Sequence, residues 1–343
     1  MLLTSRRYSV ADPAEAIELC FEKGWTDGLP VVPPTEERVR AMLDAARLRP
    51  GDQVAYIAHR AVSVAAEKVA INAVMAGCRP EYMPVVAAAV EGIGEPAWSY
   101  HGPGTSTAGA AVLIVVNGPI ARELDINAGD NLFGPGWRAN ATIGRAVRLV
   151  MRNVCGSRPG TLDRGTLGHP GKLSYLIAEN EAESPWTPLH VERGFRPEQS
   201  TVTVMAAEAP HQFYNQLSNT AEGVLTTLAD DMRISGNVMG QPQYMLVIAG
   251  EHMRTIAKDG WIKADIRRFV FEHTKNSHAH LRRTHRMAGP AKPGDETLMR
   301  PLVESPDDIL VVAAGGRAGA FSAYIPGWGS KRSSQAVTKE VKR

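Results

Sequence analysis

The chain has 343 residues, with 38 Lys and Arg residues against 36 Asp and Glu residues and a formal net charge of +2. This length allows a substantial core and two lobes, and the near balance of charge excludes a global field that would select nucleic acid or an anionic membrane. No apolar run in the sequence reaches the roughly 18–20 residues that a membrane-spanning helix needs.

Cysteine usage and the N-terminal sequence bear on the location of the protein. The three cysteines, Cys20, Cys78 and Cys155, are too few and too scattered for a disulfide framework. Residues 1–16 lack the apolar stretch of a signal peptide. We therefore expect a reduced, cytoplasmic, soluble protein whose partners include neither a membrane nor a nucleic acid.

The first 110 residues are predicted to be mainly helical. Asp12 followed by Pro13 is typical of a helix start, and Thr35 is expected to cap a second helix. Residues 66–77 and 80–94 have the apolar pattern of a packed helical pair.

A weak internal repeat follows, in which an apolar strand leads to a glycine turn, a Gly-Trp pair, a nearby cation and a helical segment. The strands are residues 111–116, 244–249 and 308–314. The Gly-Trp pairs and cations are Gly136-Trp137 with Arg138, Gly260-Trp261 with Lys263, and Gly327-Trp328 with Lys331; the last is followed by a predicted helix over 333–341. The pattern predicts an α/β fold with repeated strand–glycine turn–helix units around a mixed sheet, after an N-terminal helical segment.

Three parts of the chain are expected on this basis. Residues 1–110 form the mainly helical part, residues 111–199 form an α/β unit with the candidate site, and residues 200–343 form a second α/β lobe. Ligands in α/β folds favour the end of the sheet where the glycine turns and helix starts lie.

Residues 117–195 combine many polar side chains with segments that otherwise have the pattern of buried structure. Buried polar groups cost free energy unless they are paired, so this density predicts a networked cleft. Within it, Arg138 begins a predicted helix and is suited to grip a carboxylate or phosphate, with Asn140 and Asn117 orienting the bound group. The alternative is a tight helix start with Trp137 in the core.

Two acidic and histidine-containing segments form the second candidate element. If each segment is a strand, Glu179 shares a face with Glu181, and His190 shares a face with Glu192. Carboxylates with one histidine suit acid–base catalysis, with Glu179, Glu181 and His190 as the catalytic groups, or a divalent metal held by all four. The alternatives are a helix over 179–184 and an ordinary ion pair of Glu192 with Arg193, which is otherwise a substrate-binding candidate.

A third element is the turn Gly168-His169-Pro170-Gly171-Lys172. A histidine in such a turn has room to meet a substrate, and its unperturbed pKa suits proton transfer. His169 is therefore a catalytic candidate and Lys172 a substrate-binding candidate, with a plain surface turn as the alternative.

Several of these segments resemble a bacterial family linked to UGSC-type (seleno)proteins, which look like thiol or selenol redox modules. The similar segments lie at residues 25–35, 72–86, 116–122, 134–146, 168–172 and 178–195. In that family, a region similar to this chain is fused behind such a module or encoded beside it. The resemblance covers most of the chain, most strongly residues 25–195. Because the chain has no UGSC or CGSC element of its own, the resemblance implies a separate redox partner and a hetero-oligomer.

Three functions remain open at this point. The first is an enzyme subunit that reduces a small carboxylate-bearing substrate or cleaves a carbon–heteroatom bond in it, together with a thiol or selenol partner, as an oxidoreductase or lyase. The second is a self-sufficient hydrolase or lyase, either with or without a divalent metal. The third is a non-catalytic scaffold that binds a partner protein. We favour an enzyme, because the polar residues concentrate in turns and at strand ends.

Overall fold

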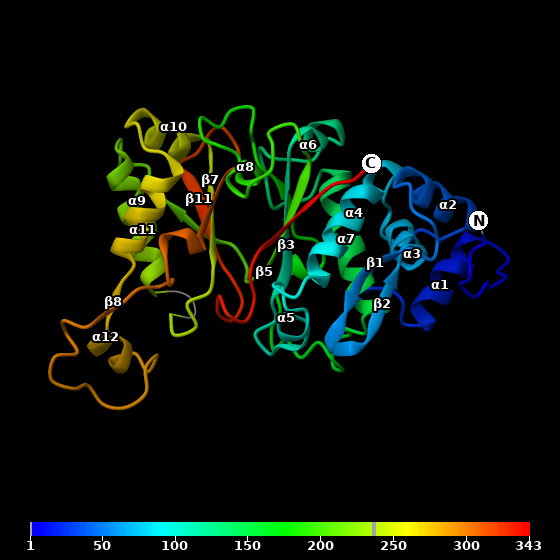
Figure 1. Ribbon diagram of the computed structural model, residues 1–343, viewed down its shortest axis with the longest axis horizontal. Coiled ribbons are helices and arrows are strands. Elements are labelled where there is room, and N and C mark those ends of the chain that lie inside the picture. Colours follow the sequence, from blue (N-terminus) through cyan, green and yellow to red (C-terminus); the bar gives the residue numbers. More distant parts are fainter. Residues whose placement is uncertain (1, 235–237) are drawn as a thin grey trace.

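Two four-stranded sheets pack face to face in the computed structural model, which describes residues 2–234 and 238–343. Helices cover the outer face of each sheet, so the molecule has four layers (Figure 1). The predicted α/β class is confirmed, with mixed sheets and many helices. Within the described residues, no helix has both the length and the apolar character needed to cross a bilayer.

The helices are α1 (Pro13–Glu22), α2 (Glu36–Ala45), α3 (Ala66–Ala76), α4 (Met83–Gly94), α5 (His101–Thr105), α6 (Pro119–Glu123), α7 (Arg138–Asn153), α8 (Leu189–Glu192), α9 (Ala221–Ile234), α10 (Gly250–Lys258), α11 (Lys263–His273) and α12 (His278–Arg283). The strands are β1 (Gln53–Ile57), β2 (Val62–Ala65), β3 (Ala111–Asn117), β4 (Leu176–Ala178), β5 (Thr201–Ala207), β6 (His211–Tyr214), β7 (Tyr244–Ile248), β8 (Asn276–Ser277), β9 (Met299–Arg300), β10 (Ile309–Ala313), β11 (Phe321–Pro326) and β12 (Val337–Glu340).

The predicted helices of the first 110 residues are confirmed. The Asp12 side chain accepts hydrogen bonds from the backbone N–H groups of Ala14 and Glu15 and so caps α1, and Thr35 caps α2 in the same way. Helix α3 ends at Gly77, whose φ of 92° lies in the left-handed region that glycine adopts without strain. The β1–β2 hairpin between α2 and α3 was not predicted.

The two sheets have the same internal order, so the repeat has two copies. In the first sheet, β3 is parallel to β4 and antiparallel to β5, which pairs with β12. In the second sheet, β7 is parallel to β10 and antiparallel to β11, which pairs with β6. The preceding helices α4 and α9 also correspond, as do α7 and α11, which follow the two Gly-Trp pairs.

The predicted third copy of the repeat is wrong. Its apolar run is β10, which lies beside β7 as β4 lies beside β3. Residues 333–341 are not the predicted helix. They contain strand β12, because this segment pairs with the free edge of β5. Gly327 marks the crossing between the sheets, where its N–H donates to the Gln243 carbonyl.

Each sheet receives its last strand from the other copy of the repeat. The chain leaves β5 in the first sheet and continues directly into β6 in the second sheet. It likewise leaves β11 in the second sheet and returns to the first sheet as β12 (Figure 1). The expected division at residues 199 and 200 stays a prediction. Strands β5 and β12 both follow it in the sequence, although they belong to the first sheet.

Alternation along β3 separates two apolar cores. Val112, Ile114 and Val116 face the helices, whereas Leu113 and Val115 face the second sheet. The corresponding residues of β7 follow the same rule, since Leu246 packs with the second helical layer and Val247 packs between the sheets. Burial of both faces explains the unbroken apolar runs that predicted these strands.

The core between the sheets should be sensitive to cavities. Leu113 is fully buried there, so Leu113→Ala should lower the free energy of unfolding by about 2–5 kcal/mol. Leu217→Ala is the matched control, because Leu217 is 98% exposed. Urea unfolding of both variants tests the assignment, and equal losses of stability would contradict it.

Candidate functional site

A polar layer closes the end of the inter-sheet core at which β3 and β4 finish. Asn117 is the last residue of β3 and is fully buried, and Thr201 lies opposite it in register at the start of β5. Helix α8 covers this end (Figure 1). Its Leu189 side chain packs between the sheets, and its His190 side chain is fully buried. The apolar core therefore ends in a set of hydrogen-bonding groups.

The centre of the layer is an ion pair between Glu179 and Lys263, both almost fully buried. The Lys263 Nζ atom donates to Glu179 Oε1 over 2.8 Å. The other oxygen of Glu179 accepts hydrogen bonds of 2.7 Å from Asn117 Nδ2 and of 2.7 Å from the Leu189 N–H. Glu179 thus joins β3, α8 and α11.

Glu181 lies beside this pair and reaches solvent. Its Oε1 atom accepts hydrogen bonds of 2.8 Å from Asn117 Nδ2 and of 2.7 Å from the Gly118 N–H, while its side chain is 27% exposed. Only glycine suits position 118, because φ is 83° and a Cβ atom there would lie 2.2 Å from the Gln199 carbonyl oxygen. The turn after β3 therefore holds the Glu181 carboxylate in place.

His190 is the fully buried histidine of the layer. Its Nδ1 atom lies 3.7 Å from Glu181 Oε1, and its Nε2 atom lies 3.4 Å from the Pro197 carbonyl oxygen. Among the described residues, His190 Nδ1, Asn117 Oδ1 and Thr201 Oγ1 are buried without a hydrogen-bond partner. Unpaired buried polar atoms are uncommon in folded proteins, so these three atoms mark the layer as a candidate site.

The outer part of the layer carries further charges. Glu192 accepts a hydrogen bond of 2.7 Å from Arg267 Nη2 and lies 3.5 Å from Lys263 Nζ. Arg193 donates to the Thr338 hydroxyl and to the Ala336 carbonyl, so it binds the segment that leads into β12. Counting Glu179, Glu181 and Glu192 against Lys263, Arg267 and Arg193, the charges cancel when His190 is neutral.

Neither of these segments is a strand, so the condition for the shared faces is not met. Residues 179–183 form a turn after β4, and Leu189–Glu192 is the short helix α8. His190 and Glu192 therefore do not share a strand face: His190 points inward, whereas Glu192 meets Arg267. Glu181 and His190 still meet, through the turn and the helix rather than across a hairpin.

Two predicted substrate-binding residues lie outside the layer. Arg138 donates through Nε and Nη2 to the Gly77 carbonyl oxygen, so it closes the end of α3. Asn140 accepts from the Asn127 N–H and donates to the Leu176 carbonyl oxygen, so it binds β4 to the preceding loop. Their contacts match a tight helix start, but Trp137 is half-buried and is not part of the core that this alternative expected.

His169 and Lys172 lie at the opposite end of the sheets. The His169 Nε2 atom is 3.3 Å from the carbonyl oxygen of Ala207, the last residue of β5, whereas the polar layer lies at the first residue of that strand. Lys172 forms an ion pair with Asp163 at 2.7 Å. These two residues therefore do not join Glu181 and His190.

The alternative of a divalent metal has no arranged ligand set in the described part of the chain, where no three or more His, Cys, Asp and Glu side chains are grouped to hold a cation. Of the four proposed ligands, Glu179 is bound to Lys263 and Glu192 to Arg267. These two carboxylates therefore already have a protein cation beside them.

Lys263, Arg267 and Thr201 were not among the predicted site residues. Lys263 follows the second Gly-Trp pair and was noted only as part of the repeat, although its position at the start of a helix was a usable signal. Arg267 follows it by one helical turn, so the same helix face carries both cations. Nothing in the sequence around Thr201 marks it.

Comparison with family models, with curated proteins and with solved structures finds no significant match to this chain. The resemblance to the family linked to UGSC-type proteins therefore stays a prediction.

The ion pair should be coupled strongly to stability. Lys263→Met leaves the Glu179 carboxylate buried without its cation and should lower the free energy of unfolding by about 3–5 kcal/mol. The double variant Lys263→Met/Glu179→Gln should recover part of this loss, because no unpaired charge remains. A double-mutant cycle measured by urea unfolding provides the test, and additive losses would contradict the coupling.

Stability should also fall on mild acidification. Burial lowers the pKa of His169 and of His252 in the folded chain. The unfolded chain then binds protons more tightly than the folded chain at these two histidines. The stability that the neutral histidines contribute is therefore fully present above about pH 6.5 and is lost as the pH falls toward the folded-state pKa. The melting temperature should drop between about pH 7.5 and pH 5.5, and His169→Gln should reduce the drop. His101→Gln is the control, because the His101 side chain is exposed. A melting temperature that does not change with pH would contradict the stability contribution of the buried histidines.

Proposed function

We propose that this chain is an enzyme subunit in which His190 and Glu181 transfer protons during reduction of a small carboxylate-bearing substrate or cleavage of a carbon–heteroatom bond in it. The observation that carries the proposal is the buried His190 Nδ1 atom, which lacks a hydrogen-bond partner among the described residues and lies 3.7 Å from Glu181 Oε1. An imidazole and a carboxylate in this relation suit general acid–base catalysis.

Glu181 connects the buried imidazole to solvent. Its side chain is partly exposed, whereas that of His190 is fully buried. In the reductive cleavage, two thiol groups of the partner are oxidised to a disulfide, and their two electrons and one of their protons form the new C–H bond at the carbon that loses the heteroatom. His190 donates its proton to the departing heteroatom, and the second proton from the thiols returns to His190 through Glu181. Asn117 orients the substrate through Oδ1, because its Nδ2 group is already used by the two carboxylates.

The reducing thiol of this proposal comes from a separate protein. All three cysteines of the chain are buried. Burial raises the pKa of Cys78 to about 12 and that of Cys155 to about 11, and it also raises the pKa of Cys20. Thiolates are the reactive form, so this chain is a poor source of thiol reductant. A thiol or selenol partner of the UGSC type in the cytoplasm would supply it.

A substrate panel tests the proposal. The purified chain is incubated with small carboxylic acids that carry a hydroxyl, amino or alkylthio group at the second or third carbon, with and without dithiothreitol as the thiol source. Release of the heteroatom group is followed by NMR. We expect turnover with the dithiol, and we expect Glu181→Gln to reduce the rate by about 100-fold or more.

Glu183→Gln is the matched control, because Glu183 lies on the same turn and pairs with Arg317 instead of the layer. It should keep the wild-type rate. Equal rates in Glu181→Gln and the wild type would contradict the role of Glu181. Turnover without the dithiol would favour a self-sufficient lyase or hydrolase. Full biological activity of His190→Asn would favour a non-catalytic scaffold.

A further inference from the structure

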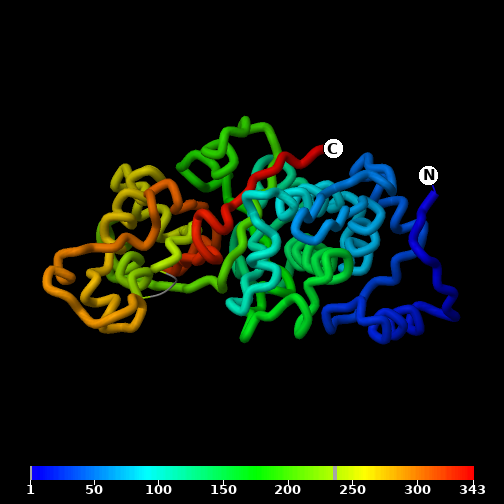
Figure 2. The backbone as a smooth tube through the Cα atoms, turned by 60° about the horizontal axis from the view of Figure 1, so that its bottom comes forward, coloured from blue at the N-terminus to red at the C-terminus, as the bar shows by residue number. Residues whose placement is uncertain are grey.

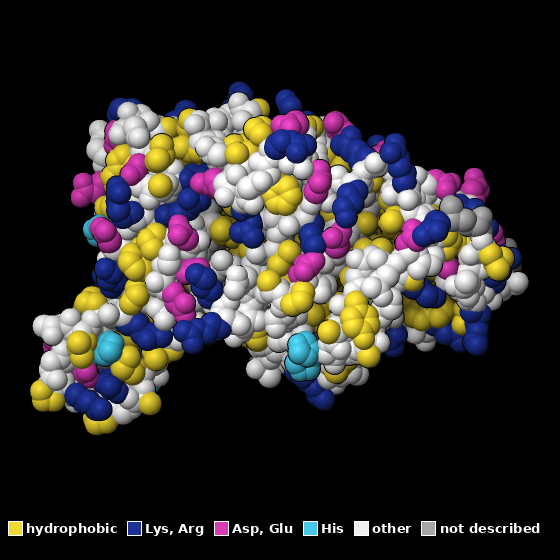
Figure 3. Space-filling view, viewed as in Figure 1, with side chains coloured by type: hydrophobic (Ala, Val, Ile, Leu, Met, Phe, Trp, Pro, Cys, Tyr) yellow, Lys and Arg dark blue, Asp and Glu magenta, His cyan; other side chains and the backbone are white. Residues whose placement is uncertain are grey.

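Residues 275–300, here called the basic arm, project from the helical layer of the second sheet (Figures 1 and 2). The arm contains β8, α12 and β9. Its first part, residues 275–292, has five Lys and Arg residues, three His residues and no acidic residue. The visible face of the arm shows Lys or Arg side chains and a His among hydrophobic and other side chains (Figure 3).

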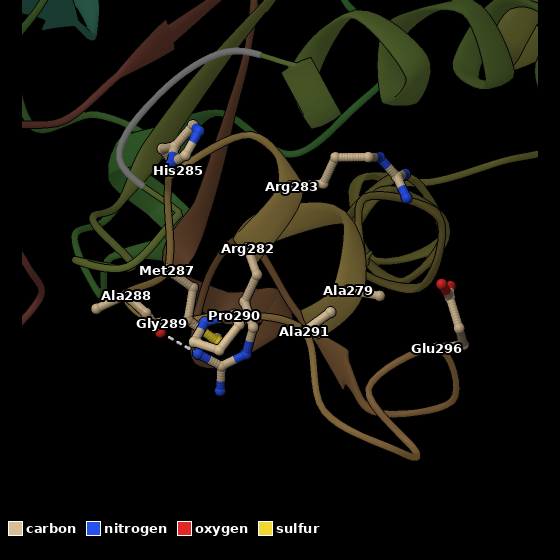
Figure 4. Close-up of a pocket in the computed structure, with 10 residues that line it drawn as sticks. All are labelled: Ala279, Arg282, Arg283, His285, Met287, Ala288, Gly289, Pro290, Ala291 and Glu296. Carbon is tan, nitrogen blue, oxygen red and sulfur yellow. Dashed lines mark hydrogen bonds between the residues drawn. The ribbon is translucent and has the colours of Figure 1, made fainter.

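The arm has a defined shape. The Asp295 carboxylate is 4% exposed and accepts hydrogen bonds of 2.8 Å from Arg282 Nε and from the Lys292 N–H. Arg282 also donates to the Ala288 carbonyl oxygen and is turned toward that loop, whereas Arg283 points away from it (Figure 4). The Arg283 side chain makes no hydrogen bond or ion pair with any other described residue, so its charge is available to a partner.

A cavity of about 670 Å³ lies between α12 and the loop that follows it (Figure 4). Met287, Pro290 and Ala291 give it an apolar wall. Its polar lining includes Arg282, Arg283 and His285 and one carboxylate, that of Glu296. A cavity of this kind suits an apolar side chain that is flanked by carboxylates. The arm contains no Phe, Tyr or Trp, so it lacks the stacking side chains with which proteins bind single-stranded nucleic acid.

Helix α1 has the complementary chemistry. Residues 11–22 carry four acidic residues and no Lys or Arg, and Cys20 is the only residue of α1 that is buried. Glu18, Phe21 and Glu22 are spaced so that they share one helix face, and all three are exposed. Within the described residues, neither Glu18 nor Glu22 has a hydrogen bond or an ion pair.

We infer that the basic arm binds α1 of a second copy of this chain, with Phe21 in the cavity and Glu18 and Glu22 beside Arg283 and His285. The arm and α1 lie at opposite ends of the molecule (Figures 1 and 2), so they cannot meet within one chain. Two different surfaces then form each contact. Such a head-to-tail contact builds rings or open chains rather than a closed two-fold dimer.

Multi-angle light scattering after gel filtration tests the assembly. At low salt, about 0.05 M, the wild-type chain should be larger than a dimer, and at about 0.5 M salt it should become smaller because the charges are screened. Arg283→Glu and Glu18→Lys should each be monomeric at low salt. Lys258→Glu reverses one charge on α10, outside both surfaces, and should assemble like the wild type.

An equal mixture of the Arg283→Glu and Glu18→Lys variants discriminates further. Each variant keeps one intact surface, and the two reversed surfaces carry opposite charges, so both contacts can form in the mixture and it should assemble again beyond a dimer at low salt. The inference is overturned if the wild-type chain is monomeric at low salt, if the two variants assemble like the wild type, or if their mixture stays monomeric. Circular dichroism of both variants confirms that each is folded.

Discussion

The buried ion pair of Glu179 and Lys263 is the constraint on which the polar end of the molecule depends. Removing both charges from water costs several kcal/mol per ion, and good geometry with additional hydrogen bonds must offset this. Glu179 meets the condition, because Asn117 and the Leu189 N–H occupy its second oxygen. The same bonds hold α8 over the sheets and place Asn117 against Glu181, so the position of His190 follows from the pair.

The two copies of the repeat differ most at this end. In the first copy, the Glu181 carboxylate accepts the hydrogen bond from the Gly118 N–H at the turn after β3. At the corresponding turn after β7, the Gly316 carbonyl oxygen accepts the hydrogen bond from the Gly250 N–H. A backbone carbonyl therefore accepts the glycine N–H hydrogen bond in one copy, and the Glu181 carboxylate accepts it in the other. The fold can satisfy this N–H group without an acidic residue, so the hydrogen bond alone does not require Glu181.

The parts of the fold that local chemistry determines could be predicted from the sequence. Asp12 and Thr35 mark helix starts through their own side chains, and β3 and β7 show as unbroken apolar runs because both faces are buried. The site could be predicted only in part. Lys263 meets Glu179 across 84 residues of chain, and α8 is too short for an apolar period to reveal it.

The unpaired atoms bear on whether the polar layer serves stability or chemistry. A network that served stability alone would satisfy its members, since each buried polar atom without a partner costs about 1–3 kcal/mol. Glu179 is satisfied in this way, and it is the member that holds the elements together. His190 Nδ1, Asn117 Oδ1 and Thr201 Oγ1 are not satisfied within the described chain. The structural role of Glu179 and Lys263 is therefore separate from the reactive role that we propose for Glu181 and His190.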